Sequence, residues 1–265
     1  MIKKILLYID LVFFGNAYSK AYEKNYKANQ ELKKLMKFSE YRYTVFYNKN
    51  NENELSILCD KYGSDKGSKD IYGKNYTWPP HTYADYYNNI FSHCRNHITK
   101  VFECGIGTNN PELSSSMGIS AKPGASLRVW RDYFPSANIF GADIDQNILF
   151  SENRIETFYL DQTSKESIEA MWRAIQISDF DLIIDDGLHT FDAGVCLFEN
   201  SIKNLSNSGI YVIEDVSPRD LIKYQKYFHK SSYIVEYVNL YRPKDKIGDN
   251  SLVVVHKKVK ANNDL

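Results

Sequence analysis

The sequence predicts an open α/β fold with a mostly parallel sheet, because short apolar segments alternate with helical patterns beyond residue 53. Three of these apolar segments end in acidic clusters: GluCysGlyIleGly (103–107), AspAspGlyLeuHis (185–189) and GluAsp (214–215). Ligands of open α/β sheets bind outside the carboxyl ends of the strands. The three clusters are therefore expected to face one crevice and to form a cofactor site beside a metal ion or a base.

The expected strands and helices follow from local patterns. Apolar segments predict strands at 99–103, 138–145, 155–160, 180–184 and 210–213, and a final antiparallel pair at 233–238 and 251–256. Helices are expected from near Ser126, after a capping box of Thr163 and Glu166, and from near Pro218, a favoured first-turn residue. A stripe at helical spacing predicts one more helix: Phe191, Val195, Phe198, Ile202 and Leu205.

The first part of the chain is expected to form a separate helical arm (residues 1–53), followed by one α/β domain (54–265). The polar segment 48–53 marks the boundary because it has no apolar periodicity. The start (1–14) could be a signal peptide, but Asp10 interrupts its apolar part, and a bilayer span needs ~20 apolar residues. Apolar spacings of three and four favour an amphipathic helix instead: Ile2, Ile5, Ile9 and Val12. We therefore expect no membrane span, and an arm that docks or makes a homo-oligomer.

Charge and cysteine content limit the function classes. Lysine plus arginine and aspartate plus glutamate each number 33, so the net charge is zero and nothing predicts a nucleic-acid partner. The four cysteines are scattered, without CxxC or zinc-site spacing. They are expected to remain thiols in a reducing compartment, which predicts a cytoplasmic protein.

The first acidic cluster favours a nucleotide cofactor. Its two glycines, Gly105 and Gly107, would let the backbone approach a ligand closely, although an ordinary tight turn explains two glycines equally well. A dinucleotide fingerprint would place a third glycine at position 110, where Asn110 stands, which disfavours a nicotinamide cofactor. Asp143 ends the next strand and suits a ribose diol, because a carboxylate accepts two hydrogen bonds.

The third predicted strand is followed by Asp161 and Gln162, which could bind an adenine edge. The alternative for Asp161 is a capping role just before Thr163.

The other two clusters favour a metal ion and a base. The carboxylates of Asp186, Glu214 and Asp215 would raise one another's pKa unless a cation lay between them. Ligands that are all oxygen favour Mg²⁺ over zinc. His189 lies three residues after Asp186, at the expected start of a helix, so one turn would bring its ring beside the ion. The alternatives are that the acids cap a helix or line the crevice, and that His189 is a surface or capping residue.

The motifs also occur in the order of a known family. GluCysGlyIleGly, GlyAlaSerLeuArgValTrp, PheGlyAlaAspIle, AspGln, IleIleAspAspGlyLeuHis and TyrValIleGluAsp resemble class I S-adenosylmethionine-dependent O-methyltransferases. More narrowly, the chain resembles metal-dependent sugar O-methyltransferases of macrolide biosynthesis and their relatives in bacterial surface-polysaccharide clusters. The resemblance runs from about Leu58 to Lys257. It includes LysTyrGlySerAspLysGly (61–67) and HisThrTyr (81–83), which resemble the cofactor lid of that family.

The resemblance implies a Rossmann-like, seven-stranded methyltransferase sandwich with the arm in front of it. It assigns S-adenosylmethionine to a site made of Glu103, Gly105, Ser126, Asp143, Asp161 and Gln162, and Asp185 is also predicted to bind the cofactor. It also assigns Mg²⁺ to Asp186, Glu214 and Asp215, and the role of general base to His189. Leu188 departs from the small polar residue usual in the family, and the AsnAsnProGlu insertion (109–112) is a second departure. Both departures bear on the identity of the substrate more than on the methyl-transfer chemistry.

The predicted activity is methyl transfer to a sugar hydroxyl of a small-molecule or glycan acceptor, such as a polysaccharide, a nucleotide-sugar or a glycosylated metabolite. Two alternatives belong to other classes. One is a non-catalytic, methyltransferase-like scaffold, which the full set of polar site residues disfavours. The other is a nicotinamide-dependent oxidoreductase, which Asn110 disfavours.

Overall fold

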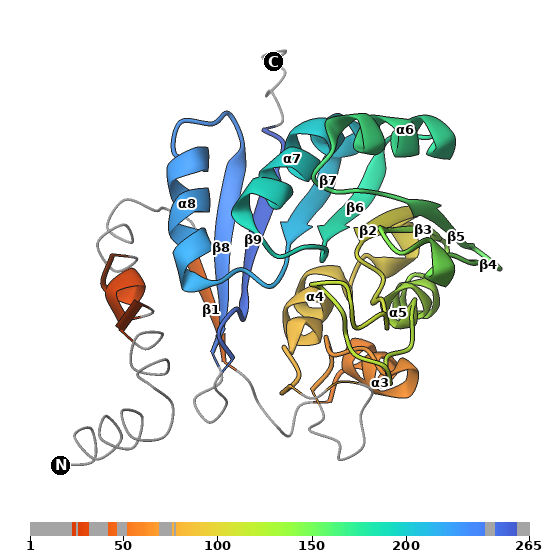
Figure 1. Cartoon of the computed structure of the whole chain (residues 1–265), viewed down its shortest axis with the longest axis horizontal. Helices are drawn as coiled ribbons and strands as arrows, with labels where there is room; N and C mark the ends of the chain where they lie inside the picture. Colours follow the sequence, from red (N-terminus) through yellow and green to blue (C-terminus); the bar gives the residue numbers. More distant parts are fainter. Residues whose placement is uncertain are drawn as a thin grey trace.

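The computed structural model describes residues 23–24, 26–31, 42–46, 52–68, 76, 78–241 and 247–258. Within these residues the chain forms a nine-stranded sheet in the order β1-β8-β9-β7-β6-β2-β3-β5-β4 (Figure 1). Its strands are β1 (Arg42–Phe46), β2 (Lys100–Cys104), β3 (Asn138–Asp143), β4 (Ser151–Glu152), β5 (Ile155–Tyr159), β6 (Phe180–Asp185), β7 (Leu205–Ile213), β8 (Ile234–Tyr241) and β9 (Ser251–His256). The seven predicted strands are all present, and β1 and β4 extend the two edges.

Strand directions match the predicted class. β9 is antiparallel to both of its neighbours, β7 and β8, and its His256 is opposite Ile234. The two-residue β4 is antiparallel to β5, and every other pairing is parallel. The mostly parallel α/β sheet and the final antiparallel pair are therefore confirmed.

In the described part of the domain, six α-helices lie between the strands: α3 (Glu54–Tyr62), α4 (Tyr83–Phe91), α5 (Ala125–Tyr133), α6 (Lys165–Ile175), α7 (Phe191–Ser201) and α8 (Pro218–Phe228). Pro218 is the first residue of α8, as predicted. The cap of α6 is Ser164 and not the predicted Thr163, because the Thr163 hydroxyl donates to Asp161 (2.7 Å) in the preceding turn. None of the helices in the described ranges is both long and apolar enough to cross a membrane.

The sheet lies between two layers of helices, and each face has its own apolar core. Helices α6, α7 and α8 cover one face, where Met171, Phe198 and Leu221 pack against strand residues (Figure 1). Helices α3, α4 and α5 cover the other face with a second core that includes Tyr87 and Trp130. Along β2, β3, β6, β7 and β9 successive buried side chains alternate between the two cores, as a sheet buried on both faces requires.

Part of the predicted arm packs against the domain. Residues 23–24 and 26–31 are helical; Ala28 is buried in the core of α6–α8, and Glu31 pairs with Lys226 of α8 (3.0 Å). β1, which also precedes the predicted boundary, joins the sheet beside β8. The amphipathic helix and the signal-peptide alternative concern residues 1–22, which lie outside the described residues. The division of the chain near residue 53 stays a prediction.

The strand register brings the acidic clusters together. Cys104 of β2 is opposite Asp185 of β6, which is in turn opposite Ile213 of β7. These three strands are parallel, so the residues that follow them emerge at the same edge of the sheet. The fold therefore places the three predicted clusters at one site.

Candidate active site

A cavity of about 370 Å³ opens at this edge of the sheet. One wall is formed by residues that end or follow the strands: Gly105, Asp143, Asp186 and Asp215. Further lining residues come from the segment between α3 and α4 and from the segment before β9: Asp65, Trp78, His81 and Asp249. The cavity thus lies where open α/β sheets bind their ligands.

The glycine loop after β2 is shaped by its neighbours. Gly105 has φ +84°, and a Cβ atom there would lie 2.0 Å from the backbone oxygen of Asp186. The Ile106 amide donates to Asp143 Oδ2 (2.9 Å), and the Asp145 amide donates to Oδ1 (3.0 Å). These contacts hold the loop at the cavity and fix the Asp143 carboxylate at its rim. Gly105 is required by the close approach of two loops, whatever the ligand.

Glu103 lies beneath this loop and does not line the cavity. It is fully buried, and its Oε2 accepts from Ser126 Oγ (2.7 Å) and from Trp130 Nε1 (3.2 Å). Burial raises the pKa of Glu103 to about 7, although the nearby Lys66 ammonium favours the charged form. Glu103 therefore links β2, which precedes the glycine loop, to Ser126 and Trp130 of α5.

Three other predicted cofactor residues lie outside the cavity lining. Asp161 accepts from the Thr163 amide (2.9 Å) in the turn before α6, whose cap is Ser164, so Asp161 is not the helix cap of its alternative assignment. Gln162 Nε2 donates to Asp185 Oδ1 (2.6 Å), and Gln162 Oε1 accepts from the Leu188 amide (2.9 Å). Burial raises the pKa of Asp185 to about 6. Gln162 and Asp185 thus fix the loop after β6, which carries the next residues of the site.

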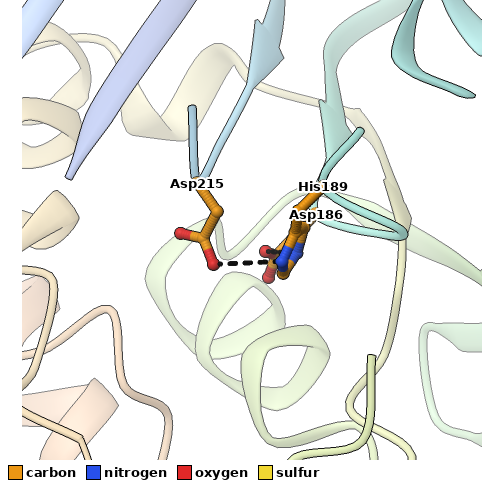
Figure 2. A group of neighbouring side chains, drawn as sticks. All are labelled: Asp186, His189 and Asp215. Atoms are coloured by element: carbon orange, nitrogen blue, oxygen red, sulfur yellow. Dashed lines mark ion pairs between the residues drawn. The ribbon is translucent and has the colours of Figure 1, made fainter. Parts of the chain in front are cut away.

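Asp186, His189 and Asp215 converge on one point at the cavity wall (Figure 2). His189 Nε2 lies 3.3 Å from Asp186 Oδ1, and His189 Nδ1 lies 3.5 Å from Asp215 Oδ2. One ligand atom from each residue lies within 4.8 Å of the others, a spacing that could hold a metal ion. Asp186 and His189 follow β6 and Asp215 follows β7, so the strand register produces the cluster.

Backbone conformation, and not a helical turn, places His189 beside Asp186. His189 precedes α7 and has φ +56°, and Asp215 has φ +52°. Non-glycine residues rarely adopt this left-handed region, and those that do are concentrated at functional sites. α7 starts just after His189, so the predicted reach through one helical turn was wrong, although the predicted proximity to Asp186 is present.

Opposite charges attract the side chain of His189 to those of Asp186 and Asp215. Burial disfavours the charged imidazole of His189, but Asp215 and Asp186 outweigh burial and raise its pKa to about 10. Burial likewise disfavours the Asp186 carboxylate, but Lys66 and His189 lower its pKa to about 2. The imidazolium therefore serves as a counter-cation for two carboxylates.

Glu214, the third predicted metal ligand, faces a different partner. It is 1% exposed; its Oε1 accepts from Tyr87 Oη (2.6 Å), and its Oε2 pairs with Lys66 Nζ. Lys66 Nζ also contacts Asp186 Oδ2 (2.5 Å) and Glu103 Oε1 (3.3 Å). The structure therefore brings Asp186 and Asp215 together with His189 and directs Glu214 toward a buried lysine.

Three further residues of the site, Lys66, Tyr83 and Tyr87, were not predicted from the sequence. Tyr83 Oη donates to Asp215 Oδ1 (2.6 Å), and His81 Nδ1 lies 3.4 Å from the same oxygen. The segments around residues 61–67 and 81–83 were noted as resembling a cofactor lid. That resemblance was the available signal, but it did not indicate that these side chains contact the acids.

The chain is similar in sequence to proteins of known function. No family model matches the chain. It is 31% identical over 162 residues to 8-demethyl-8-alpha-L-rhamnosyl tetracenomycin-C 2'-O-methyltransferase of Streptomyces olivaceus, covering 61% of this chain and 37% of that protein. It is 32% identical over 137 residues to mycinamicin VI 2''-O-methyltransferase of Micromonospora griseorubida, covering 51% of this chain and 32% of that protein. The chain thus spans about a third of the length of these curated relatives.

A solved structure shows the fold. The MycE methyltransferase of the mycinamycin biosynthetic pathway, in complex with Mg and SAH, superposes with a TM-score of 0.56 at 22% identity. The superposition covers 81% of this chain and 57% of that one. The Rossmann-like methyltransferase fold is therefore confirmed, as is the resemblance of the chain to sugar O-methyltransferases.

Proposed function

We propose that this chain, which has a methyltransferase fold and resembles sugar O-methyltransferases, transfers a methyl group from S-adenosylmethionine to a sugar hydroxyl. A divalent cation, most simply Mg²⁺, would assist, and His189 would act as the general base. The observation that carries the proposal is the convergence of His189, Asp186 and Asp215 in the cavity beside the glycine loop.

The cofactor would occupy the part of the cavity next to the glycine loop. Gly105, Gly107 and Asp143 line this part. Two backbone amides orient the Asp143 carboxylate, which retains lone pairs to accept from a ribose diol. Glu103 and Ser126 would act beneath the loop as its support. Asp161, Gln162 and Asp185, which were predicted to contact the cofactor, would then act through the loops that they hold.

The acids fit a hard divalent cation. Asp186 and Asp215 offer carboxylate oxygens, the ligands that Mg²⁺ prefers, and they lie close to one another and to His189. Glu214 would join them only after its contact with Lys66 is released. When bound, such an ion supplies Lewis acidity that lowers the pKa of an acceptor hydroxyl.

His189 can accept a proton only when its imidazole is neutral. Asp186 and Asp215 hold its pKa near 10, so at neutral pH they keep the proton on the ring. A cation that neutralises these two carboxylates would return the pKa of His189 toward its ordinary value of ~6.5. The ring could then take the hydroxyl proton during methyl transfer. The same two carboxylates would thus couple cation binding to the availability of the base.

The charge of the cavity favours an uncharged acceptor. Within the described part of the chain its lining contains no lysine or arginine, and five aspartates outnumber the two histidines, His81 and His189: Asp65, Asp143, Asp186, Asp215 and Asp249. A phosphorylated acceptor would be repelled by these carboxylates. Trp78, whose Nε1 donates to Asp65 (2.8 Å), adds an aromatic surface for a sugar ring. We therefore favour a neutral glycoside over a nucleotide-sugar.

A methyl-transfer assay tests the proposal. The protein would be incubated with methyl-labelled S-adenosylmethionine and a panel of neutral glycosides, including rhamnosides, beside the matching nucleoside diphosphate sugars. We expect label to enter a neutral glycoside, EDTA to lower the rate at least about tenfold, and added Mg²⁺ to restore it. Full activity in EDTA would contradict the role of the cation. Preferential labelling of the nucleotide-sugars would contradict the acceptor assignment.

A surface-polysaccharide acceptor, self-association of the chain and a cytoplasmic location stay predictions from the sequence.

A further inference from the structure

Lys66 is a buried cation at the acidic edge of the sheet. Its side chain is 3% exposed, and its ammonium lies among the carboxylates of Glu103, Asp186 and Glu214. Charged lysines are almost never buried unless they are paired. Three carboxyl groups therefore share this one buried ammonium.

The carboxylates that hold Lys66 overlap with those of the candidate metal site. Asp186 contacts Lys66 through Oδ2 and His189 through Oδ1, so one carboxylate belongs to both groups. Glu214, predicted from the sequence as a metal ligand, is engaged by Lys66 and Tyr87. An ion that used Asp186 and Glu214 together would have to displace the lysine.

We propose that Lys66 competes with the divalent cation for Asp186 and Glu214. Its ammonium neutralises these carboxylates when no ion is bound, and it withdraws from them when an ion binds. This inference rests on the proposed metal-assisted function. The sequence predicts Glu214 as a metal ligand beside Asp186 and Asp215, whereas the structure shows it bound to Lys66. The competition accounts for both.

The surroundings of Lys66 allow its side chain to move while its backbone stays in place. The Lys66 carbonyl accepts from the Ala84 amide (2.9 Å), and the Gly67 carbonyl accepts from the Thr82 amide (3.1 Å), which fixes the loop to the start of α4. A small cavity of about 20 Å³ adjoins the side chain and is lined by Gly105, Ser126 and Lys122. That volume suffices for one water-sized group, and an ammonium is of similar size.

The competition predicts that metal affinity rises when the lysine is removed. Mg²⁺ would be titrated into EDTA-stripped wild type, Lys66→Met and Lys122→Met by isothermal titration calorimetry. Lys66→Met is expected to bind Mg²⁺ at least about tenfold more tightly, or about 1.4 kcal/mol, because a positive charge next to the ion is gone. Lys122 lines the same small cavity but is exposed, so Lys122→Met should change the affinity less than about twofold.

Each outcome separates this inference from the proposed function. Tighter binding by Lys66→Met, or binding by that variant alone, supports the competition. Equal or weaker binding overturns it. If neither the wild type nor Lys66→Met binds Mg²⁺ but S-adenosylhomocysteine still raises the unfolding midpoint, the competition is wrong and the methyltransferase proposal stands. If S-adenosylhomocysteine does not raise the unfolding midpoint either, the proposed function itself fails. Lys66→Gln, which can still donate to the carboxylates, replaces Lys66→Met if the latter does not fold.

Discussion

Replacing His189 by alanine is expected to lower the turnover of methyl transfer by ~10² to 10⁴, the usual contribution of a general base. The imidazole lies between Asp186 and Asp215 at the cavity wall, where it can reach an acceptor hydroxyl. The Asp143 carboxylate that we assign to the ribose is held by the Ile106 and Asp145 amides and not by His189, so the affinity for S-adenosylhomocysteine should stay within about threefold of the wild type.

A matched control for this variant is His93→Ala. His93 is exposed on the turn that follows α4 and does not line the cavity, so its loss should leave turnover unchanged. Both variants would be compared by steady-state kinetics and by calorimetric titration of S-adenosylhomocysteine. Wild-type turnover in His189→Ala would exclude this residue as the base.

The adjacent acids at the end of β6 should respond differently to the same substitution. Asp186→Asn removes a carboxylate that faces the cavity, so we expect both Mg²⁺ binding and most turnover to be lost. Asp185→Asn changes a buried group that accepts from Gln162 and is outside the cavity lining. It should retain Mg²⁺ binding, with its main effect on stability.

The two variants have the same charge change one residue apart, which makes each the control for the other. Mg²⁺ titration and turnover with EDTA and with added Mg²⁺ are the measurements. Equal loss of metal binding in both variants would indicate a general disturbance of the loop after β6. Retained metal binding in Asp186→Asn would remove this carboxylate from the site.

Much of the fold was predictable because its strands are buried and its helices amphipathic. In β6 (Phe180–Asp185) the apolar LeuIleIle segment is followed at the carboxyl edge of the sheet by Asp185, so the end of this strand is visible in the sequence. The edge strands were not predicted. β4 has only two residues, and β1 lies in a segment that was expected to be helical, although its ArgTyrThrValPhe sequence is rich in strand-forming residues.

The site was predictable only where its contacts are local or follow from the sheet register. Asp186 and His189 are three residues apart, and β6 and β7 are neighbours, so their convergence with Asp215 could be expected. The contact of Lys66 with Glu214 spans 148 positions and depends on the docking of the loop that follows α3. The periodicity of apolar residues in the sequence does not indicate such a contact. The left-handed backbone of His189 is likewise a product of the tertiary structure.

The most direct test of the central claim is the thermal unfolding midpoint with and without S-adenosylhomocysteine, with NADH as the control. A ligand at a hundred times its Kd stabilises a protein by about 2.7 kcal/mol, which should raise the midpoint by several degrees. We predict a rise with S-adenosylhomocysteine and none with NADH. No shift with S-adenosylhomocysteine would contradict the methyltransferase proposal and favour a non-catalytic scaffold, and a shift with NADH alone would favour an oxidoreductase.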